Sequence, residues 1–359
     1  MEAVQHRSAE HVHSGYADTV SASVLSQAPS GGFPALSGRS PRWVRGIYIA
    51  NLVVQGGIVV TGAVVRITGS GLGCPTWPEC TEGSFVPTAE QVESWHKFIE
   101  FGNRLLTFVL AAAAIAAVVA ALIDRRRRRQ LGLAPRPVLT VLAVVPLVGT
   151  AVQAVLGGIT VLTGLHPLTV SAHFLVSIAL IAACVALVVR SGEPGDRPVR
   201  WLVAKPVRLL TWALVAATLV VVILGVITTG SGPHSGDADV VVRFGFDPRT
   251  VAWLHADSVL LFLGLTIGLL VTAHVASAPR RLTKRIVILL ALSLVQGFLG
   301  YSQYFTGLPE LLVSLHVLGA VLVWIAVLFL PPTLRSRGVD PGHDAGIEPG
   351  MARKAAGAV

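Results

Sequence analysis

Long apolar stretches alternate with short polar segments between residues 47 and 330. Each stretch is close to the roughly 20 residues that an α-helix needs to cross a bilayer. An open sheet leaves edge groups unsatisfied in lipid, and the alternation typical of a membrane barrel is absent. The pattern predicts an all-α, polytopic membrane protein with eight transmembrane helices, in the stretches Ile47–Val65, Phe98–Ile123, Val138–Leu162, Leu168–Val189, Leu209–Ile227, Val251–Val275, Ile286–Phe305 and Leu311–Leu330.

Composition and charge agree with a membrane protein. Of 359 residues, 53% are hydrophobic and 6% aromatic, and the formal net charge is +9. In a soluble chain this charge would suggest nucleic acid, but the arginines cluster between apolar stretches and few rings are available for base stacking. We expect a lipid bilayer as the surroundings and no nucleic-acid partner.

The arginine clusters also predict the orientation in the membrane. They lie in residues 125–136, 190–208, 280–285 and 335–337, whereas the alternate loops are acidic or nearly uncharged. Cationic loops face the cytoplasm, so both termini are expected there. Arginine far outnumbers lysine, and Ala, Val and Gly abound, which favours a bacterial plasma membrane over an organelle.

We predict five segments along the chain. Residues 1–42 form a polar, disordered cytoplasmic tail that lacks the apolar core of a signal peptide. A four-helix bundle spans residues 43–190, and a cytoplasmic linker spans residues 191–208. A second four-helix bundle spans residues 209–331, and a second disordered cytoplasmic tail spans residues 332–359.

An internal repeat relates Val152–Leu175 to Val295–Leu318. At an offset of 143, twelve of twenty-four positions are identical, including the pair His173 and His316. The sequence Thr-Gly-Ser-Gly also occurs at the outer ends of the first and fifth apolar stretches, at residues 68–71 and 229–232. The repeat predicts two pseudo-symmetric bundles related by an axis along the membrane normal.

Three histidines are predicted to lie at one depth in the membrane. A rise of about 1.5 Å per residue places His173, His255 and His316 roughly 7–10 Å below the outer surface. A histidine within the membrane is costly, and a neutral imidazole is a good iron ligand. His255 and His316 lie on alternate helices of the second bundle, where they can clamp a planar macrocycle from both sides. Histidines that bond to neighbouring helices are the alternative.

Symmetry places Asn103 opposite His173 in the first bundle, because Phe101-Gly-Asn103 corresponds to Trp253-Leu-His255. An asparagine replaces imidazole poorly as an iron ligand. The first site is therefore expected to be five-coordinate or otherwise open, as suits a substrate that binds, reacts and leaves. The alternative is an asparagine that bonds across helices.

His96, Glu100 and Asn103 share one face of the second predicted helix, with Arg104 adjacent. A carboxylate in this position suits a proton relay or general base, and an ion pair with Arg104 or Lys97 is the alternative.

Further polar residues gather near the outer surface. His96 and His166 are candidates for a substrate pocket, with an iron pair and rim histidines of no special role as alternatives. Arg66 and Arg104 are candidates for pairing with haem propionates, although an arginine at the boundary more often extends to the interface.

Cys74 and Cys80 lie in the first outer loop, in a compartment that permits oxidation. Two cysteines alone make a poor zinc site, so a disulfide is favoured. It either staples the loop or forms a redox-sensitive lid. Cys184 is expected to be a small packing residue.

Two segments carry a resemblance to a known family. The run Val65-Arg-Ile-Thr-Gly-Ser-Gly-Leu-Gly-Cys74 with Trp77-Pro-Glu-Cys80, followed by His96-Lys-Phe-Ile-Glu-Phe-Gly-Asn-Arg104, resembles haem A synthase. The likeness extends from about Trp43 to Leu330. It implies an eight-helix membrane oxidoreductase that oxidises a methyl group of haem O to the formyl group of haem A.

The resemblance also implies roles for individual residues. His255 and His316 would hold a haem b cofactor, Glu100 and His173 would belong to the substrate haem half, and Cys74–Cys80 would be the outer-loop disulfide. The implied partners are haem O as substrate, an upstream haem O synthase and the assembly of a terminal oxidase.

The chain departs from the family pattern at two places. Where the family has Glu-x-x-His, this chain has Glu100-Phe-Gly-Asn103, and it lacks the second cysteine pair that some relatives have between the fifth and sixth helices. Two other functions are weighed: a membrane haem-binding electron carrier, which should have four symmetric histidines, and a haem transporter or chaperone. A homo-oligomer is an open alternative.

Overall fold

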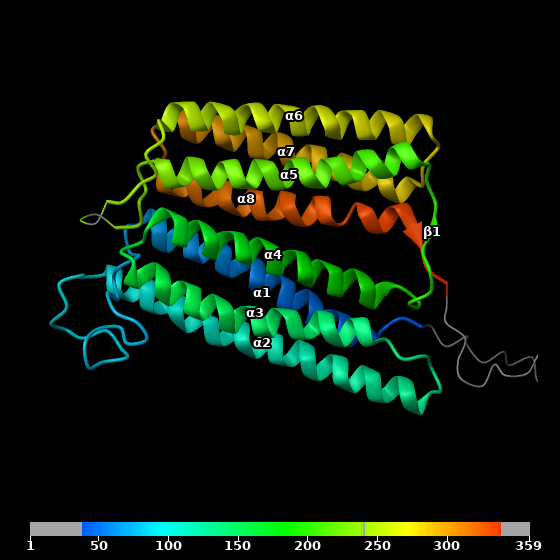
Figure 1. Cartoon of the computed structure of the whole chain (residues 1–359), viewed down its shortest axis with the longest axis horizontal. Coiled ribbons are helices and arrows are strands. Elements are labelled where there is room, and N and C mark those ends of the chain that lie inside the picture. Colours follow the sequence, from blue (N-terminus) through cyan, green and yellow to red (C-terminus); the bar gives the residue numbers. More distant parts are fainter. Residues whose placement is uncertain (1–37, 238, 240, 339–359) are drawn as a thin grey trace, which may run out of the picture. The chain divides into compact units, whose positions relative to one another are not determined.

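Eight long helices make up most of the part of the chain that the computed structural model describes, residues 38–237, 239 and 241–338. Each is long and apolar enough to cross a membrane, so the predicted all-α polytopic fold is confirmed. The helices are α1 (Arg42–Ile67), α2 (His96–Gln130), α3 (Pro137–Leu162), α4 (Pro167–Gly192), α5 (Lys205–Ser231), α6 (Pro248–Val275), α7 (Arg280–Phe305) and α8 (Glu310–Leu328) (Figure 1).

The helices form two groups of four. In each group every helix packs against the next, and the first also packs against the fourth. Between the groups α1 contacts α8, α5 contacts α4, and α4 contacts α8. A two-fold axis that exchanges α1–α4 with α5–α8 relates the first two contacts to each other and the third to itself. Figure 1 shows the two groups as separate sets of near-parallel helices. We call them the first and the second bundle, as the repeat predicts.

The repeat is visible in the backbone of two helix turns. α3 is followed by Gly164 and Leu165 with φ of 60° and 58°, and α7 is followed by Gly307 and Leu308 with φ of 79° and 61°. In both turns the leucine amide donates to a carbonyl five residues earlier, at 2.8 and 2.7 Å. Two consecutive left-handed residues end each helix and reverse the chain. The next helix of each bundle therefore begins in the same way.

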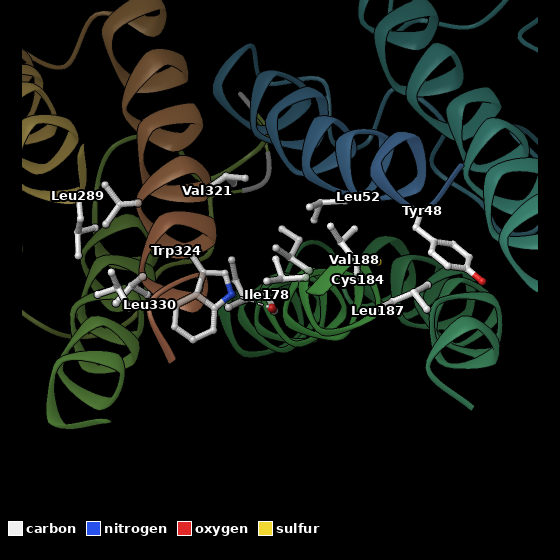
Figure 2. Packing of buried hydrophobic residues seen from close by; sticks show 14 of the residues in the cluster. Tyr48, Leu52, Ile178, Cys184, Leu187, Val188, Leu289, Val321, Trp324 and Leu330 are labelled. Carbon is white, nitrogen blue, oxygen red and sulfur yellow. Dashed lines mark hydrogen bonds between the residues drawn. The ribbon is translucent and has the colours of Figure 1, made fainter. Parts of the chain in front are cut away.

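Buried apolar side chains are concentrated in one half of the bundles. We call this the inner half, where α1 begins and α2 ends, and the other the outer half. The cluster includes Tyr48 and Leu52 of α1, Ile178 of α4 and Trp324 of α8 (Figure 2). The indole Nε1 of Trp324 donates to the carbonyl of Ile178 at 3.0 Å, which joins the two bundles.

The outer half contains a layer in which few side chains are buried. In the second bundle no residue is buried over 219–229 of α5, over 252–261 of α6, or from 294 to 320 across α7 and α8. In the first bundle the same holds over 101–109 of α2, 151–157 of α3 and 168–177 of α4. Ten helical residues span about 15 Å. The three histidines predicted at one depth, His173, His255 and His316, lie in this layer, and so does Asn103, which symmetry places opposite His173.

Residues next to the predicted tails are built into the inner end. Ser40 donates through Oγ to Asp124 at 2.8 Å, so the predicted disorder of residues 1–42 is wrong for 38–42. The strand β1 (Arg200–Trp201) pairs antiparallel with β2 (Arg335–Ser336), after a short helical turn η1 (Pro331–Leu334). Disorder from residue 332 is thus wrong as far as residue 338, because backbone pairing fixes this segment. Residues 1–37 and 339–359 lie outside the described part.

The predicted linker of residues 191–208 is shorter in the structure, since α4 ends at Gly192 and α5 begins at Lys205. Two linker carboxylates bind arginines of the first bundle and of the segment that follows the second bundle. Asp196 pairs with Arg136 at 3.0 Å and with Arg190 at 2.6 Å. Glu193 pairs with Arg190, with Arg335 at 3.5 Å and with Arg337 at 3.3 Å. We call these six side chains the inner clasp.

Candidate functional site

His255 and His316 face each other across the second bundle. Their ring centroids are 6.5 Å apart, with an angle of 74° between the ring planes. An imidazole nitrogen lies about 1.1 Å from its ring centre and about 2.0 Å from a bound metal, so two axial imidazoles on one iron hold their ring centres about 6.2 Å apart. The observed separation fits this arrangement. The alternative, in which each ring bonds to a neighbouring helix, is also represented, because the backbone of Val221 on α5 lies beside His255 and that of Gln296 on α7 lies beside His316.

Each of these two rings lies against a glycine of the neighbouring helix. A Cβ atom at Gly225 would lie 3.1 Å from Cε1 of His255, and one at Gly300 would lie 3.2 Å from Cε1 of His316. Both Nδ1 atoms are buried. Two neutral imidazoles with this spacing are a suitable axial ligand pair for a haem iron.

No group of three or more His, Cys, Asp or Glu side chains that could hold a metal ion occurs among the described residues. A macrocycle supplies four equatorial nitrogens itself, so it needs only one or two ligands from the protein. The histidine pair therefore fits a haem.

His173 of the first bundle repeats the surroundings of His316. The amide of Gln153 donates to the carbonyl oxygen of His173 at 2.9 Å, and Gln296 donates to that of His316 at 2.7 Å. A Cβ atom at Gly157 would lie 3.5 Å from the His173 ring. The Nδ1 atom of His173 is also buried without a hydrogen-bond partner in the described part of the chain. One half of the imidazole clamp is thus present in both bundles.

Asn103, the residue expected opposite His173, bonds to the neighbouring helix. Its Oδ1 accepts from the hydroxyl of Thr61 on α1 at 2.8 Å. This is the cross-helix bond that was the alternative to a direct role at the site.

Glu100 and Arg104 bind each other and the outer loop. The ion pair measures 2.6 Å from Nη2 to Oε1, and the amide of Cys74 donates to Oε2 at 2.6 Å. Arg104 in turn donates to the carbonyls of Cys74 and Thr76 at 2.8 and 3.0 Å. The ion-pair alternative for Glu100 is therefore present. Lys97 instead donates to the carbonyl of Thr88 at 2.6 Å.

The outer loop of residues 68–95 covers the first bundle. The predicted disulfide Cys74–Cys80 is formed, and Cys184 is buried in α4 as predicted. The Trp77 ring lies against Gly158 of α3, where a Cβ atom would come within 2.4 Å of it. Lys97 and Glu100 are buried beneath this loop. We call the loop the roof.

The two rim histidines have separate local partners. Nδ1 of His96 is 2.8 Å from the hydroxyl of Ser70, and the ring stacks on Trp95. His166 is exposed and caps α4, where its Nδ1 accepts from the amide of Leu168 at 3.3 Å. These contacts correspond to the alternative of structural rim histidines.

Arg66 links the two bundles at the outer end. Its Nε donates to the carbonyl of His234 at 2.9 Å and its Nη2 to that of Thr229 at 3.2 Å. Nε2 of His234 is 3.0 Å from the carbonyl of Leu308. Sequence reasoning missed His234, Gln153 and Gln296. The two glutamines were detectable, because they occupy matching positions of the repeat.

The chain is a polytopic membrane protein built from a duplicated four-helix bundle. One copy carries a facing pair of imidazoles, and the other copy, which the roof covers, carries a single histidine. The chain matches the COX15-CtaA family, described as cytochrome oxidase assembly protein, over residues 45–234. It therefore belongs to this family, and the resemblance to haem A synthases is confirmed.

Relatives carry the name Heme A synthase. The protein of Bacillus licheniformis is 26% identical over 189 residues, which cover 51% of this chain and 57% of the relative. The protein of Geobacillus kaustophilus is 33% identical over 76 residues, or 21% of each chain, and that of Geobacillus thermodenitrificans is 33% identical over 75 residues. The chain thus matches little more than half the length of the first of these relatives.

Proposed function

We propose that this protein is a haem A synthase, a membrane oxidoreductase that converts a methyl group of haem O into the formyl group of haem A. The observation that carries the proposal is the histidine pair of the second bundle, at 6.5 Å between ring centroids, beside a first bundle that repeats one half of the pair. The names of the relatives support the reaction. The product would serve the assembly of a terminal oxidase, after a haem O synthase has supplied the substrate.

The second bundle would hold haem b between His255 and His316. When bound, this group supplies a one-electron redox centre within the membrane. The protein's own contribution is to fix the rings. Gly225 and Gly300 let them lie close to neighbouring helices, and Gln296 holds the backbone of α8 at His316.

The first bundle would bind haem O through His173, which Gln153 and Gly157 support in the same way. The roof would exclude water from the outer side of this site. Arg104 would contribute by holding the roof in place, since its N–H groups donate to Glu100 and to backbone carbonyls of the roof. Arg66, His96 and His166 would shape the outer rim.

We assign Glu100 a proton-accepting role beside its structural one. A carboxylate has about four acceptor positions, and Arg104 and the Cys74 amide use three. Conversion of a methyl to a formyl group removes four electrons and adds one oxygen atom, for which an external electron acceptor and an oxygen source would be needed. The remaining position would accept one of the protons released in that oxidation. We further propose that the roof faces outward and both termini face the cytoplasm of a bacterium, because the arginine-rich segments lie at the inner end.

One experiment separates the enzyme from a carrier. Haem is extracted from membranes of a strain that lacks the gene and from the same strain with the gene restored, and is separated by chromatography. The proposal expects haem A only with the gene and an accumulation of haem O without it. Unchanged haem types would favour an electron carrier or a haem transporter, and would overturn the proposed function.

A further inference from the structure

We propose that the first bundle holds an iron porphyrin through a single protein ligand, His173, and leaves the opposite axial position open to a small exogenous ligand such as carbon monoxide or cyanide. The inference rests on the proposed function in one respect, that the first bundle takes an iron porphyrin. The sequence suggests a five-coordinate or otherwise open site; this inference commits to the five-coordinate state with His173 as the ligand and adds the class of molecule that binds opposite it.

The argument starts from the equivalence of His173 and His316. Both are supported by a glutamine that donates to their own carbonyl, at 2.9 and 2.7 Å, and both rings lie over a glycine of the preceding helix. Both have a buried Nδ1. Equivalent surroundings should give the two imidazoles equivalent roles, so His173 is an axial ligand wherever His316 is one.

The position opposite His173 lacks an imidazole. In the second bundle His255 stands 6.5 Å from His316, centroid to centroid. The corresponding residue of the first bundle is Asn103, whose Oδ1 accepts from Thr61 at 2.8 Å. A neutral carboxamide is a weak ligand for iron compared with imidazole. Its oxygen is, moreover, held toward α1.

The other histidines near the first bundle in the described part of the chain have different partners. His96 contacts Ser70 through Nδ1 at 2.8 Å, within the hydrogen-bonded base of the roof. His166 is exposed and caps the first turn of α4. Neither occupies the position that symmetry gives to His255. The first site is therefore expected to have one strong protein ligand, whereas the second has two.

Coordination number has a spectroscopic signature that does not depend on turnover. Iron with two axial imidazoles is six-coordinate, low-spin and closed to carbon monoxide, whereas iron with one imidazole is five-coordinate, high-spin and open to it. The full-length protein in detergent is loaded with ferric haem b to saturation. Spin states are measured by electron paramagnetic resonance, and carbon monoxide binding is measured after reduction.

We expect two haems per chain, one low-spin and one high-spin, with carbon monoxide bound to one of the two. The variant Asn103→His should restore the symmetric clamp, convert the high-spin signal to low-spin and abolish carbon monoxide binding. Asn103→Ala is the matched control, because it removes the carboxamide without adding a ligand and should keep both signals. His173→Ala should lose the haem that binds carbon monoxide and keep the low-spin one.

Two low-spin haems in the unaltered protein, or saturation at one haem per chain, would overturn the inference. So would full carbon monoxide binding in Asn103→His, provided that the low-spin haem of the second bundle shows the variant to be folded. Failure of the proposed function is a separate result. If the protein binds carbon monoxide at the first site but forms no haem A, the proposed function fails and this inference stands. If it forms haem A but holds two low-spin haems, this inference fails and the proposed function stands.

Discussion

The guanidinium of Arg66 donates to the backbone carbonyl of His234 at 2.9 Å, so that a helix of the first bundle is tied to a loop of the second. Hydrogen bonds to charged groups contribute about 1.5–3 kcal/mol each. Arg66→Ala should therefore lower the free energy of unfolding by about 2 kcal/mol, measured by thermal unfolding in detergent. Arg243→Ala is the control, because this exposed arginine contacts Pro233 within the same loop. Equal stability of the two variants would show that the link contributes nothing.

Removal of either clamp histidine should remove the haem of the second bundle. His316→Ala and His255→Ala are each expected to abolish the low-spin haem b absorbance of the purified protein, since one imidazole cannot hold the six-coordinate state. His274→Ala is the matched control, because His274 lies on the same helix as His255 but is exposed at its inner end. Full retention of low-spin haem in His316→Ala would refute the ligand assignment.

Glu100→Gln tests whether the carboxylate moves a proton or only holds the roof. The variant keeps an acceptor for the Cys74 amide but loses the charge that pairs with Arg104. We expect haem b to be retained and haem A formation to fall at least a hundredfold, as for the loss of a general base.

Arg104→Gln breaks the same ion pair and leaves the carboxylate in place. If Glu100 served only to hold the roof, both substitutions would reduce haem A formation equally. Glu90→Gln, an exposed change in the same loop, should have no effect. Limited proteolysis of residues 68–95 reports the state of the roof in each variant.

The disulfide Cys74–Cys80 closes a short loop within the roof. Loops of this length contribute about 2 kcal/mol through the entropy of the unfolded chain. The variant with both cysteines changed to serine should be cleaved faster in the outer loop and should keep the low-spin haem b, because the second bundle does not contain this bridge. Loss of haem b from that variant would mean that the roof supports both bundles.

The inner clasp makes a prediction that depends on salt. Glu193 contacts Arg190, Arg335 and Arg337, and its side chain is 15% exposed. Glu193→Gln should lower the free energy of unfolding by about 1–3 kcal/mol at low salt, and by less in 1 M salt because screening already weakens the pairs. A difference that does not respond to salt would exclude an electrostatic cause.

The helices and the depth of the histidines could be predicted because both follow from local sequence. Hydropathy marks the lipid-crossing stretch but not the end of the helix. The second stretch was predicted at Phe98–Ile123, whereas α2 runs from His96 to Gln130, since its arginines continue the helix beyond the apolar run. The pairing of His255 with His316 followed from the repeat and the common depth.

A bond of Asn103 across helices was an alternative from the sequence, but the partners of Asn103 and Arg66 could not be predicted in the same way. The contact of Asn103 with Thr61 depends on how α1 and α2 are rotated against each other, which a hydrophobic pattern this uniform does not specify. The contact of Arg66 with His234 joins residues 168 positions apart in different bundles. Such contacts arise from packing between elements, so they become visible only in the folded chain.

The left-handed turns after α3 and α7 limit the insertions and deletions that the duplicated segments can tolerate. Leu165 precedes His173 by the same eight residues as Leu308 precedes His316, so each turn fixes the angle at which the following ring emerges. One inserted or deleted residue in either interval would swing the ring by about 100° around the helix axis and direct it toward a neighbouring helix or the acyl chains. Length between turn and histidine is therefore a stricter requirement of this architecture than the identity of the side chains along that interval.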